Sequence, residues 1–446
     1  MKMSVLAVLL LSIAARAAAT TTEVGPADNW TAIMQGLQPG DTLIMDDGTY
    51  VLNGYFSISL HGTSASPILI RAQDGARPVI QQNADQNIVN ILGSTYLTID
   101  GLTFTGGSIG LRFLGSAATP AMGGSDITIR NCHIHDTPAN AIAANSSGVD
   151  YARFSFIHNE IDHTGDTGEG FYLGCNNNEC QFHDSLIANN YIHDLDGATV
   201  TQGDGIEIKQ GSYANVVQDN VIHDTGYPGI TMYGVSGNGA VNIIQRNIVW
   251  NSGDNGIQVT ADAIVRNNIV LSECSSCAAF ASNAIQGASA ANLTIVNNTF
   301  LAPGSAKGIR LNGVSGTVIV ANNAIYAPNG NAIYANGALG GVTVVANAGA
   351  GSLSGVASGF DNSGNIASDF FSANLSGVPP QNLVPKGNVL VGTANASYLP
   401  SDDFSTNART TADIGAYRAV ASGNPGWPIQ AGFKVDDQIF ANGFEP

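Results

Sequence analysis

The chain has 446 residues, and its 34 Asp and Glu outnumber its 16 Lys and Arg, giving a formal net charge of -18. Nucleic acids and anionic membranes both require a basic surface, so this charge argues against either as a partner. Gly is abundant, with 53 residues, while charged residues make up only 11% of the chain. This composition is typical of a protein with many tight turns and a large uncharged interior.

The N-terminus has the pattern of a secretory signal peptide. Lys2 precedes an apolar run over residues 5–11, and Ala17-Ala18-Ala19 supplies a cleavage site. The run is too short to span a membrane, and no other segment approaches the required length. We therefore expect residues 1–19 to direct export from a Gram-negative bacterium, into the periplasm or the medium, without membrane insertion. The competing interpretation is a buried N-terminal strand.

A short amphipathic helix is predicted over residues 28–37, with Trp30, Ile33 and Leu37 on its buried face. The repeats that follow it predict a stack of β-coils, and such a stack exposes apolar core and unpaired strand edges at its ends. The helix is therefore expected to cap the N-terminal end of the stack.

The segments after this helix resemble a known family. Residues 37–43 read Leu-Gln-Pro-Gly-Asp-Thr-Leu, and residues 47–50 read Asp-Gly-Thr-Tyr. Together with residues 63–72, they resemble the first coil of secreted β-helix polysaccharide lyases, including the alginate lyases and chondroitinase B. The resemblance implies how the fold begins and includes no catalytic residue.

From about residue 130 to residue 340 the chain repeats a sequence motif with two parts. The first part is an Asn-led apolar strand, which recurs at Asn159, Asn190, Asn220, Asn247, Asn268, Asn298 and Asn323. The second part is Gly-Ile-x-aliphatic, which begins at Gly205, Gly229, Gly256 and Gly308, with a looser copy at Ala332. The Asn residues are 31, 30, 27, 21, 30 and 25 positions apart, about the length of one solenoid coil.

Each repeat holds two or three strands of alternating polarity and no run of helical period. One coil cannot bury its own apolar face, so it must stack on the next, and stacked Asn side chains can hydrogen-bond along the stack. The pattern resembles pectate-lyase-like proteins. This resemblance implies an all-β, right-handed, single-stranded parallel β-helix over residues 20–420, which we expect to be a monomer.

The last part of the chain is less regular. Beyond about residue 340 it loosens into Gly, Ser and Ala. Residues 402–404 and 413–417 resemble the closing segment of many secreted β-helix proteins, which implies that they seal the last coil. Residues 421–446 are expected to form a linker and a tail similar to a short ending on exported proteins of some Gram-negative bacteria. A sorting signal and a disordered end are both open for this tail.

The five cysteines suit an oxidising compartment. Cys175 with Cys180, and Cys274 with Cys277, lie close in sequence within insertions between coils, and we expect two local disulfides. Cys132 is left over and occupies the position that is Asn in later coils. No His lies beside the two pairs, so a zinc site is not expected there.

One strand face gathers the densest set of ionisable side chains. Alternation points Ile206 and Ile208 inward and Glu207 and Lys209 outward. With rungs about 4.8 Å apart, neighbouring coils extend this patch to about 5 by 7 Å. The neighbouring side chains on this face are Tyr172, Thr231 and Tyr233, with Glu169 and Asp204 at the edge. Later coils carry mostly uncharged polar groups at the same positions, which predicts a polar groove for a polysaccharide.

Lyase chemistry assigns a role to each of these residues. β-Elimination beside a uronic carboxylate requires a base for the C5 proton, a cation for the carboxylate and an acid for the leaving oxygen. We predict Lys209 as the base, provided that a neighbouring cation lowers its pKa, and Tyr233 or Tyr172 as the acid. The hard oxygen ligands of a Ca²⁺ cofactor would be Glu169, Asp204 and Glu207. The residues predicted to bind sugar are Thr231, Gln258 and Arg310.

The strand Glu207-Ile208-Lys209 resembles the acidic strand followed by Lys in chondroitinase-B-like lyases. Those proteins carry Arg-His-Gly on the following coil, whereas residues 231–234 here read Thr-Met-Tyr-Gly. The Arg of that segment is therefore missing from its expected place, and the resemblance does not extend to the family's standard mechanism. An epimerase would use the same proton abstraction and cannot be separated from a lyase by these residues.

Three other interpretations of the patch remain open. Glu207 and Lys209 could form a simple ion pair on one strand face. Two of Glu169, Asp204 and Glu207 could serve a glycoside hydrolase, although the paired-Asp and His-Gly signatures of β-helix polygalacturonases are missing. The chain could also be a carbohydrate-binding solenoid without turnover.

A second set of polar residues follows the Asn-led strands. His-Asp or Asp-His pairs recur in successive coils and should stack in columns; they lie at residues 135–136, 162–163, 193–194 and 223–224. Such columns suit a transition metal. Asp at a strand end also caps turns, with a local hydrogen bond to the adjacent His, and this second interpretation is favoured.

Overall fold

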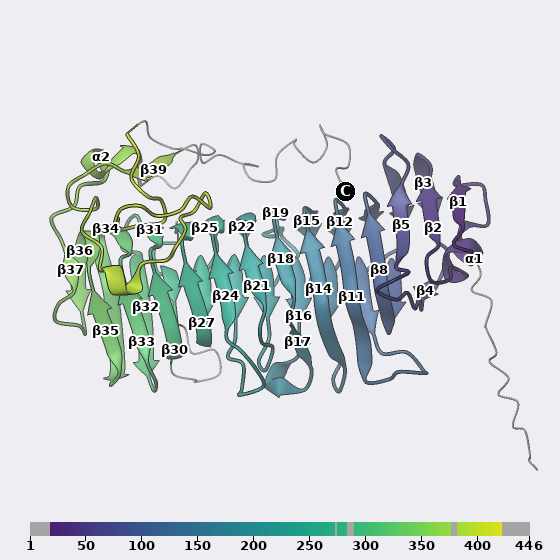
Figure 1. Cartoon of the computed structure of the whole chain (residues 1–446), viewed down its shortest axis with the longest axis horizontal. Coiled ribbons are helices and arrows are strands. Elements are labelled where there is room, and N and C mark those ends of the chain that lie inside the picture. Colours follow the sequence, from purple (N-terminus) through teal and green to yellow (C-terminus); the bar gives the residue numbers. More distant parts are fainter. Residues whose placement is uncertain (1–17, 273, 283–289, 376–380, 422–446) are drawn as a thin grey trace, which may run out of the picture.

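The computed structural model describes residues 18–272, 274–282, 290–375 and 381–421, and it is an elongated parallel β-helix (Figure 1). Successive coils stack along the long axis, and every coil contributes strands to up to three rows that run the length of the molecule. The predicted all-β solenoid is therefore confirmed. The predicted signal peptide, except residues 18 and 19, and the predicted linker and tail, except residue 421, lie outside the described residues.

The first row forms one parallel sheet, with β17 (Gln181–His183) paired beside it. Its strands are β1 (Thr21–Val24), β2 (Thr42–Met45), β5 (Ile68–Ala72), β8 (Ser94–Asp100), β11 (Met122–Arg130), β14 (Asp150–Ile157), β18 (Leu186–Ala188), β21 (Val216–Gln218), β24 (Asn242–Gln245), β27 (Ala261–Arg266), β30 (Ala291–Val296), β33 (Val318–Ala321) and β35 (Val342–Val345).

The second row holds the Asn-led strands. They are β3 (Gly48–Val51), β6 (Pro78–Gln81), β9 (Thr103–Thr105), β12 (His133–Thr137), β15 (Glu160–Thr164), β19 (Tyr191–His193), β22 (Val221–Thr225), β25 (Ile248–Ser252), β28 (Ile269–Leu271), β31 (Thr299–Leu301), β34 (Ala324–Leu339), β36 (Asn347–Ser354) and β37 (Phe360–Asp361).

The third row holds the Gly-Ile strands, and β34 and β36 are long enough to continue into it. Its other strands are β4 (Ser57–Ile58), β7 (Val89–Leu92), β10 (Leu111–Leu114), β13 (Ile142–Ala144), β16 (Phe171–Leu173), β20 (Ile206–Ile208), β23 (Ile230–Met232), β26 (Ile257–Val259), β29 (Ala278–Ala281) and β32 (Lys307–Val314).

The turn between the first and second rows is built by the predicted Asn ladder. In each rung a residue with positive φ, such as Asn189 at 56°, precedes a fully buried ladder Asn and turns the chain sharply. The amide of Asn190 donates to Asn220 Oδ1 at 2.9 Å and to the Phe156 carbonyl at 3.0 Å. The same bonds link Asn159 through to Asn347, so each coil helps to fix the position of the next.

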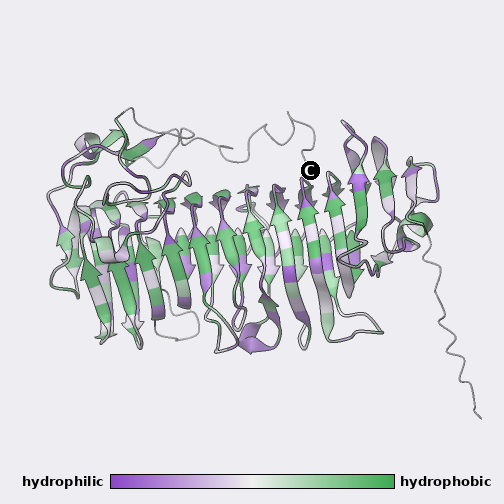
Figure 2. Ribbon diagram, viewed as in Figure 1, coloured by the Kyte–Doolittle hydropathy of each residue, from purple (hydrophilic) through white to green (hydrophobic). Residues whose placement is uncertain are grey.

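The interior is filled by the inward residues of all three rows. Stacked aromatic rings dominate one stretch, where Phe154 packs on Phe113 at 4.9 Å and on Phe182 at 5.4 Å between ring centroids. Apolar residues concentrate on the strands and polar residues at the coil corners (Figure 2). Within the strands, the two-residue alternation places apolar side chains inward and polar side chains outward.

Helix α1 (Trp30–Gln35) stands at the N-terminal end of the stack, where the capping helix was predicted (Figure 1). Trp30 is buried and packs on Tyr50 and Phe56. Met34 is the second buried residue of the helix, while Ile33 is only partly buried. Strand β1 precedes the helix and begins the first row, a feature that the sequence pattern did not predict.

The C-terminal segment, residues 366–421, does not seal the last coil as expected. It contains helix α2 (Ile366–Asp369), the antiparallel pair β38 (Phe370–Ser372) and β39 (Asn382–Pro385), and a 3-10 turn over Ala396–Tyr398. Its buried residues, which include Phe370 and Phe404, form a second apolar core with outward residues of the second row. The segment therefore runs back along the side of the helix.

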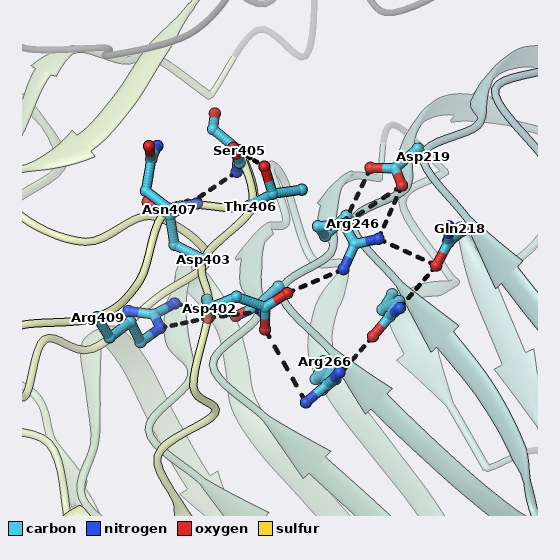
Figure 3. Close-up of polar contacts among 12 residues, drawn as sticks. Gln218, Asp219, Arg246, Arg266, Asp402, Asp403, Ser405, Thr406, Asn407 and Arg409 are labelled. Carbon is cyan, nitrogen blue, oxygen red and sulfur yellow. Dashed lines mark hydrogen bonds and ion pairs between the residues drawn. The ribbon is translucent and has the colours of Figure 1, made fainter.

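An ion-pair network holds this segment in place, as Figure 3 shows. Asp402 pairs with Arg246 at 3.0 Å, and Arg246 also pairs with Asp219 at 2.9 Å. Arg409 donates to the Asp402 carbonyl at 3.0 Å and to Asn267 Oδ1 at 2.9 Å. The contacts of Asp402 with Arg246 and of Arg409 with Asn267 join residues more than 130 positions apart.

Both predicted disulfides, Cys175–Cys180 and Cys274–Cys277, are present. Cys132 is free and buried in the ladder, as expected, and its backbone amide donates to Asn159 Oδ1. In the described part of the chain no helix is long and apolar enough to cross a membrane.

Candidate functional site

The third row brings the predicted site residues together. Tyr172 pairs with Glu207, Glu207 with Thr231, and Thr231 with Gln258, so these side chains form one outward column. Arg310 stands two rungs beyond Gln258 in the same column. The inward partners on these strands are apolar, so alternation alone determines which side chains leave the core.

Three carboxylates meet beside this column. Glu169, Asp204 and Glu207 each place an oxygen within 4.8 Å of the others, and their residues are only 0%, 3% and 3% exposed. Thr231 donates to Asp204 Oδ1 at 2.5 Å, and the Asn140 amide donates to Glu169 Oε2. Among the described residues, Glu169 Oε1 and Glu207 Oε2 have no hydrogen-bond partner. Two buried acceptor oxygens are therefore left for a ligand.

Asp204 and Glu207 resist ionisation. Burial, and then the negative charge of Glu207, hold the pKa of Asp204 well above its usual range. Burial also raises the pKa of Glu207, although the neighbouring Lys209 ammonium partly opposes this rise. A bound cation would favour the ionised forms of both groups.

Lys209 closes one side of the cluster. Its Nζ donates to Glu207 Oε1 at 2.5 Å and lies 4.6 Å and 5.3 Å from the ring centres of Tyr172 and Tyr233. Burial lowers the pKa of Lys209, but the Glu207 carboxylate more than offsets this effect, so the net pKa is raised. Lys209 was predicted to act as a base provided that a neighbouring cation lowers its pKa. No described side chain supplies such a cation. Without such a cation Lys209 is an ammonium ion.

The two tyrosines also keep their protons. Burial raises the pKa of Tyr233 to about 12, and burial raises the pKa of Tyr172 as well. A protonated phenol can donate a proton to a leaving oxygen, which is the role predicted for one of them.

The predicted open patch is wrong in one respect. Glu207 and Lys209 leave the core as expected, but Lys209 is only 5% exposed and Tyr233 only 7%, so they are not part of an open groove. The half-buried ring of Tyr172 is the accessible part of this side of the site. Burial arises because long side chains from adjacent rungs lie over one another.

The predicted sugar-binding residues fall into two groups. Thr231 and Gln258 are buried, and both are engaged within the protein, Gln258 by the Asn255 amide at 2.8 Å. Arg310 is half-buried and donates to Asn255 Oδ1 at 3.3 Å. Of these three side chains, only that of Arg310 is partly exposed.

Sequence reasoning missed three residues of this face. Asn140 and Asn255 occupy the positions equivalent to Glu169 and Asp204 in other coils, and Arg112 stands two rungs before Tyr172 in the outward column. Counting two residues back from each inward Ile would have found the two asparagines. Arg112 and Arg310 place one basic group at each end of the column.

Residues 68–270 and 189–349 match the model of a family described as the right handed beta helix region. The chain belongs to this family. The match also supplies the right-handed sense that the family resemblance implied.

Solved structures share this fold at low sequence identity. The structure of XylC in complex with xylose is 12% identical, with a TM-score of 0.57, and the match covers 88% of this chain and 95% of that chain. An alginate lyase from Paenibacillus sp. str. FPU-7 is 19% identical, with a TM-score of 0.38, over 77% and 98% of the two chains. Pectate lyase Pel9A is 13% identical, with a TM-score of 0.44, over 90% and 96%. No curated protein matches the sequence. At these identities the likeness shows the fold alone.

Proposed function

We propose that this protein is a secreted, monomeric polysaccharide lyase that cleaves a uronate-containing glycan by β-elimination. The observation that carries the proposal is the buried cluster of Glu169, Asp204 and Glu207, with two unpartnered oxygens, beside Lys209 and two protonated tyrosines. The two disulfides fit an oxidising compartment outside the cytoplasm.

The cluster fits a Ca²⁺ ion. Three carboxylates supply the hard oxygen ligands that calcium prefers, and the free oxygens of Glu169 and Glu207 are available without breaking a bond in the protein. Calcium bound there would neutralise the uronate carboxylate and so make the C5 proton more acidic.

The protein's own groups would then share the proton transfers. With a cation on the free oxygen of Glu207, the Glu207 carboxylate would stabilise the Lys209 ammonium less, and the charge of the cation would also lower the pKa of Lys209 toward that of a base. Tyr172, the more accessible of the two phenols, would donate its proton to the leaving oxygen. Arg112 and Arg310 would bind carboxylates of the glycan on either side, which a chain of net charge -18 requires for a polyanionic substrate.

A glycoside hydrolase is the second candidate. The raised pKa of Asp204 suits a general acid. The oxygens of Asp204 and Glu207 lie within 4.8 Å of each other, which is closer to the carboxylate separation of about 5 Å in retaining enzymes than to the larger separation in inverting enzymes. A uronate epimerase would share the first proton transfer with the lyase and release no new chain end.

The decisive experiment is an absorbance assay for unsaturated uronate, with alginate, pectate and glycosaminoglycans, with and without Ca²⁺. A lyase gives a rise that Ca²⁺ supports and that Lys209→Ala reduces by about 100-fold or more. Lys307→Ala is the matched control, because Lys307 also lies over a tyrosine of the third row, at 5.7 Å from Tyr334, but away from the carboxylates. It should keep full activity.

Other outcomes separate the alternatives. Reducing ends without absorbance would establish hydrolysis, and a changed uronate configuration without cleavage would establish epimerisation. Binding without any of these products would make the protein a carbohydrate-binding solenoid. A rise in absorbance that Lys209→Ala leaves intact would remove Lys209 from the mechanism.

A further inference from the structure

A second cluster of ligand groups lies on the second row, on strands β12, β15 and β19. The registers of these strands place Glu160 between His133 and Tyr191, and Asp162 between His135 and His193. Each of these side chains points outward, because the residue between them on each strand is a buried Ile. Three successive coils thus supply imidazole and carboxylate groups to one spot.

The donor atoms converge as metal ligands do. His193 Nε2 lies 3.4 Å from Glu160 Oε1 and 4.0 Å from Asp162 Oδ2. His133 Nε2 lies 2.6 Å from the same Asp162 oxygen. In a tetrahedral site with metal–ligand bonds of about 2.0–2.1 Å, neighbouring donors are about 3.3 Å apart. The separations straddle this value, so small side-chain rotations suffice to bind an ion.

The outer contacts of this cluster also match those of metal sites. His193 uses its other ring nitrogen, Nδ1, to contact Asp194 Oδ2 at 2.7 Å, which directs Nε2 toward Glu160 and Asp162. The remaining oxygen of Asp162 contacts His163 Nδ1. Ligating histidines generally bond a carboxylate through the nitrogen that does not bind metal, and this bond fixes the ring orientation.

The cluster is both sheltered and reachable. The side chains of Asp162 and His193 are 9% and 13% exposed, whereas those of His133 and Glu160 are 35% and 39% exposed. His133 and Glu160 also line a cavity of about 460 Å³, bounded by the turn over residues 72–77 and by the corner at Asn131 and Cys132. An ion would therefore have protein on one side and an open approach on the other.

We propose that His133, Glu160, Asp162 and His193 form a site for a divalent transition-metal ion of the zinc class. Two imidazoles and two carboxylates suit Zn²⁺, Ni²⁺ or Cu²⁺, whereas Ca²⁺ and Mg²⁺ prefer oxygen ligands alone. The two carboxylates balance the charge of the ion. The site belongs to a different strand row from the carboxylate cluster of Glu169, and it does not depend on the proposed lyase activity.

The test is metal binding by the full protein after treatment with a chelator. Titration calorimetry should show saturable binding of one Zn²⁺, and Co²⁺ should give the visible absorption of a low-coordinate site with nitrogen ligands. A 100-fold excess of Ca²⁺ should not displace the zinc. His193→Ala and Glu160→Gln should each weaken zinc binding by at least about 10-fold.

Two control variants separate this site from the rest of the protein. His61→Ala removes an exposed histidine elsewhere, and Glu169→Gln alters the carboxylate cluster of the third row; both should bind zinc like the wild type. Glu160→Gln changes a half-exposed side chain, so it tests the site even if His193→Ala fails to fold. Absence of saturable zinc binding, or unchanged affinity in both site variants, would overturn the proposal.

Discussion

The second row presents two different outer faces on one repeating backbone. On β12, β15, β19 and β22 its outward column reads His135, Asp162, His193 and His223. On β25, β28, β31 and β34 the same column reads Trp250, Leu271, Leu301 and Tyr326. The C-terminal segment covers the second set, and the first set faces outward without that cover. The column changes character where His223 stacks on Trp250 at 4.3 Å.

This difference shows that the fold does not depend on which side chains occupy the outward column. The inward residues and the Asn ladder are alike beneath both halves, so the coil does not require either kind of outer side chain. The outward column determines instead what packs against this face. The apolar side chains of one half pack against the C-terminal segment of the same chain, and the polar side chains of the other half remain available for ions or ligands.

Exchanging the types of side chain between the two halves of this column should have the largest effect on stability. Leu301→His should lower the free energy of unfolding by about 4 kcal/mol, because it removes a buried apolar side chain and leaves an imidazole without a partner under the C-terminal segment. His135→Leu, in the same column of the other half, should change it by less than about 1 kcal/mol. Chemical denaturation of both variants checks this. Equal costs would show that the two faces are not distinct.

Removing the anchor of the C-terminal segment should have the next largest effect. Arg409 donates to the carbonyls of Gly415 and Ala416, both at 2.8 Å, in addition to its bonds to Asp402 and Asn267. Arg409→Ala should therefore destabilise the protein by about 3 kcal/mol, since several buried acceptors lose a charged donor.

The control for this variant is Arg153→Ala. Arg153 makes a bidentate pair with Asp126, but its side chain is 54% exposed, so its loss should cost less than about 1 kcal/mol. If the two arginine variants were equally stable, the C-terminal segment would not depend on the network of Figure 3.

The smallest expected effect concerns Cys132, which lies in the interior beneath the uncovered half of the second row. We expect water to be excluded from this part of the interior as it is from the rest. Burial raises the pKa of the Cys132 thiol to about 12, from an ordinary value near 9.0. The folded state therefore holds this proton more tightly than the unfolded state, and the stability so gained is present below pH 9 and is lost as the pH rises toward 12. Between pH 9 and 10.5 the loss should be about 2 kcal/mol.

The measurement is the stability of wild type relative to Cys132→Ala as a function of pH. The difference should fall over this interval, and alkylation of the native thiol at pH 8 should be far slower than in denaturant. Rapid alkylation of the folded protein would show that water reaches this part of the ladder.

Much of the architecture could be predicted because its causes are local. From Asn159 to Asn347 each ladder Asn follows a residue with positive φ, and an inward Ile alternates with an outward polar residue, so both features repeat within a few positions of the sequence. The stacking of Tyr172, Glu207 and Thr231 follows from that alternation. The two disulfides joined cysteines that are three and five positions apart.

The sequence by itself thus determined the parallel β-helix, the order of its outward columns and the membership of the carboxylate cluster. Only the tertiary structure decided how far Lys209 and Glu207 are buried, because their exposure depends on long side chains from three coils at once. It also decided where the C-terminal segment lies, since that position depends on contacts such as Asp402 with Arg246, which are 156 residues apart. The periodicity of the sequence predicts which residues are neighbours within a coil and between coils. The burial of a side chain and the position of the C-terminal segment depend instead on side-chain packing between residues far apart in the sequence.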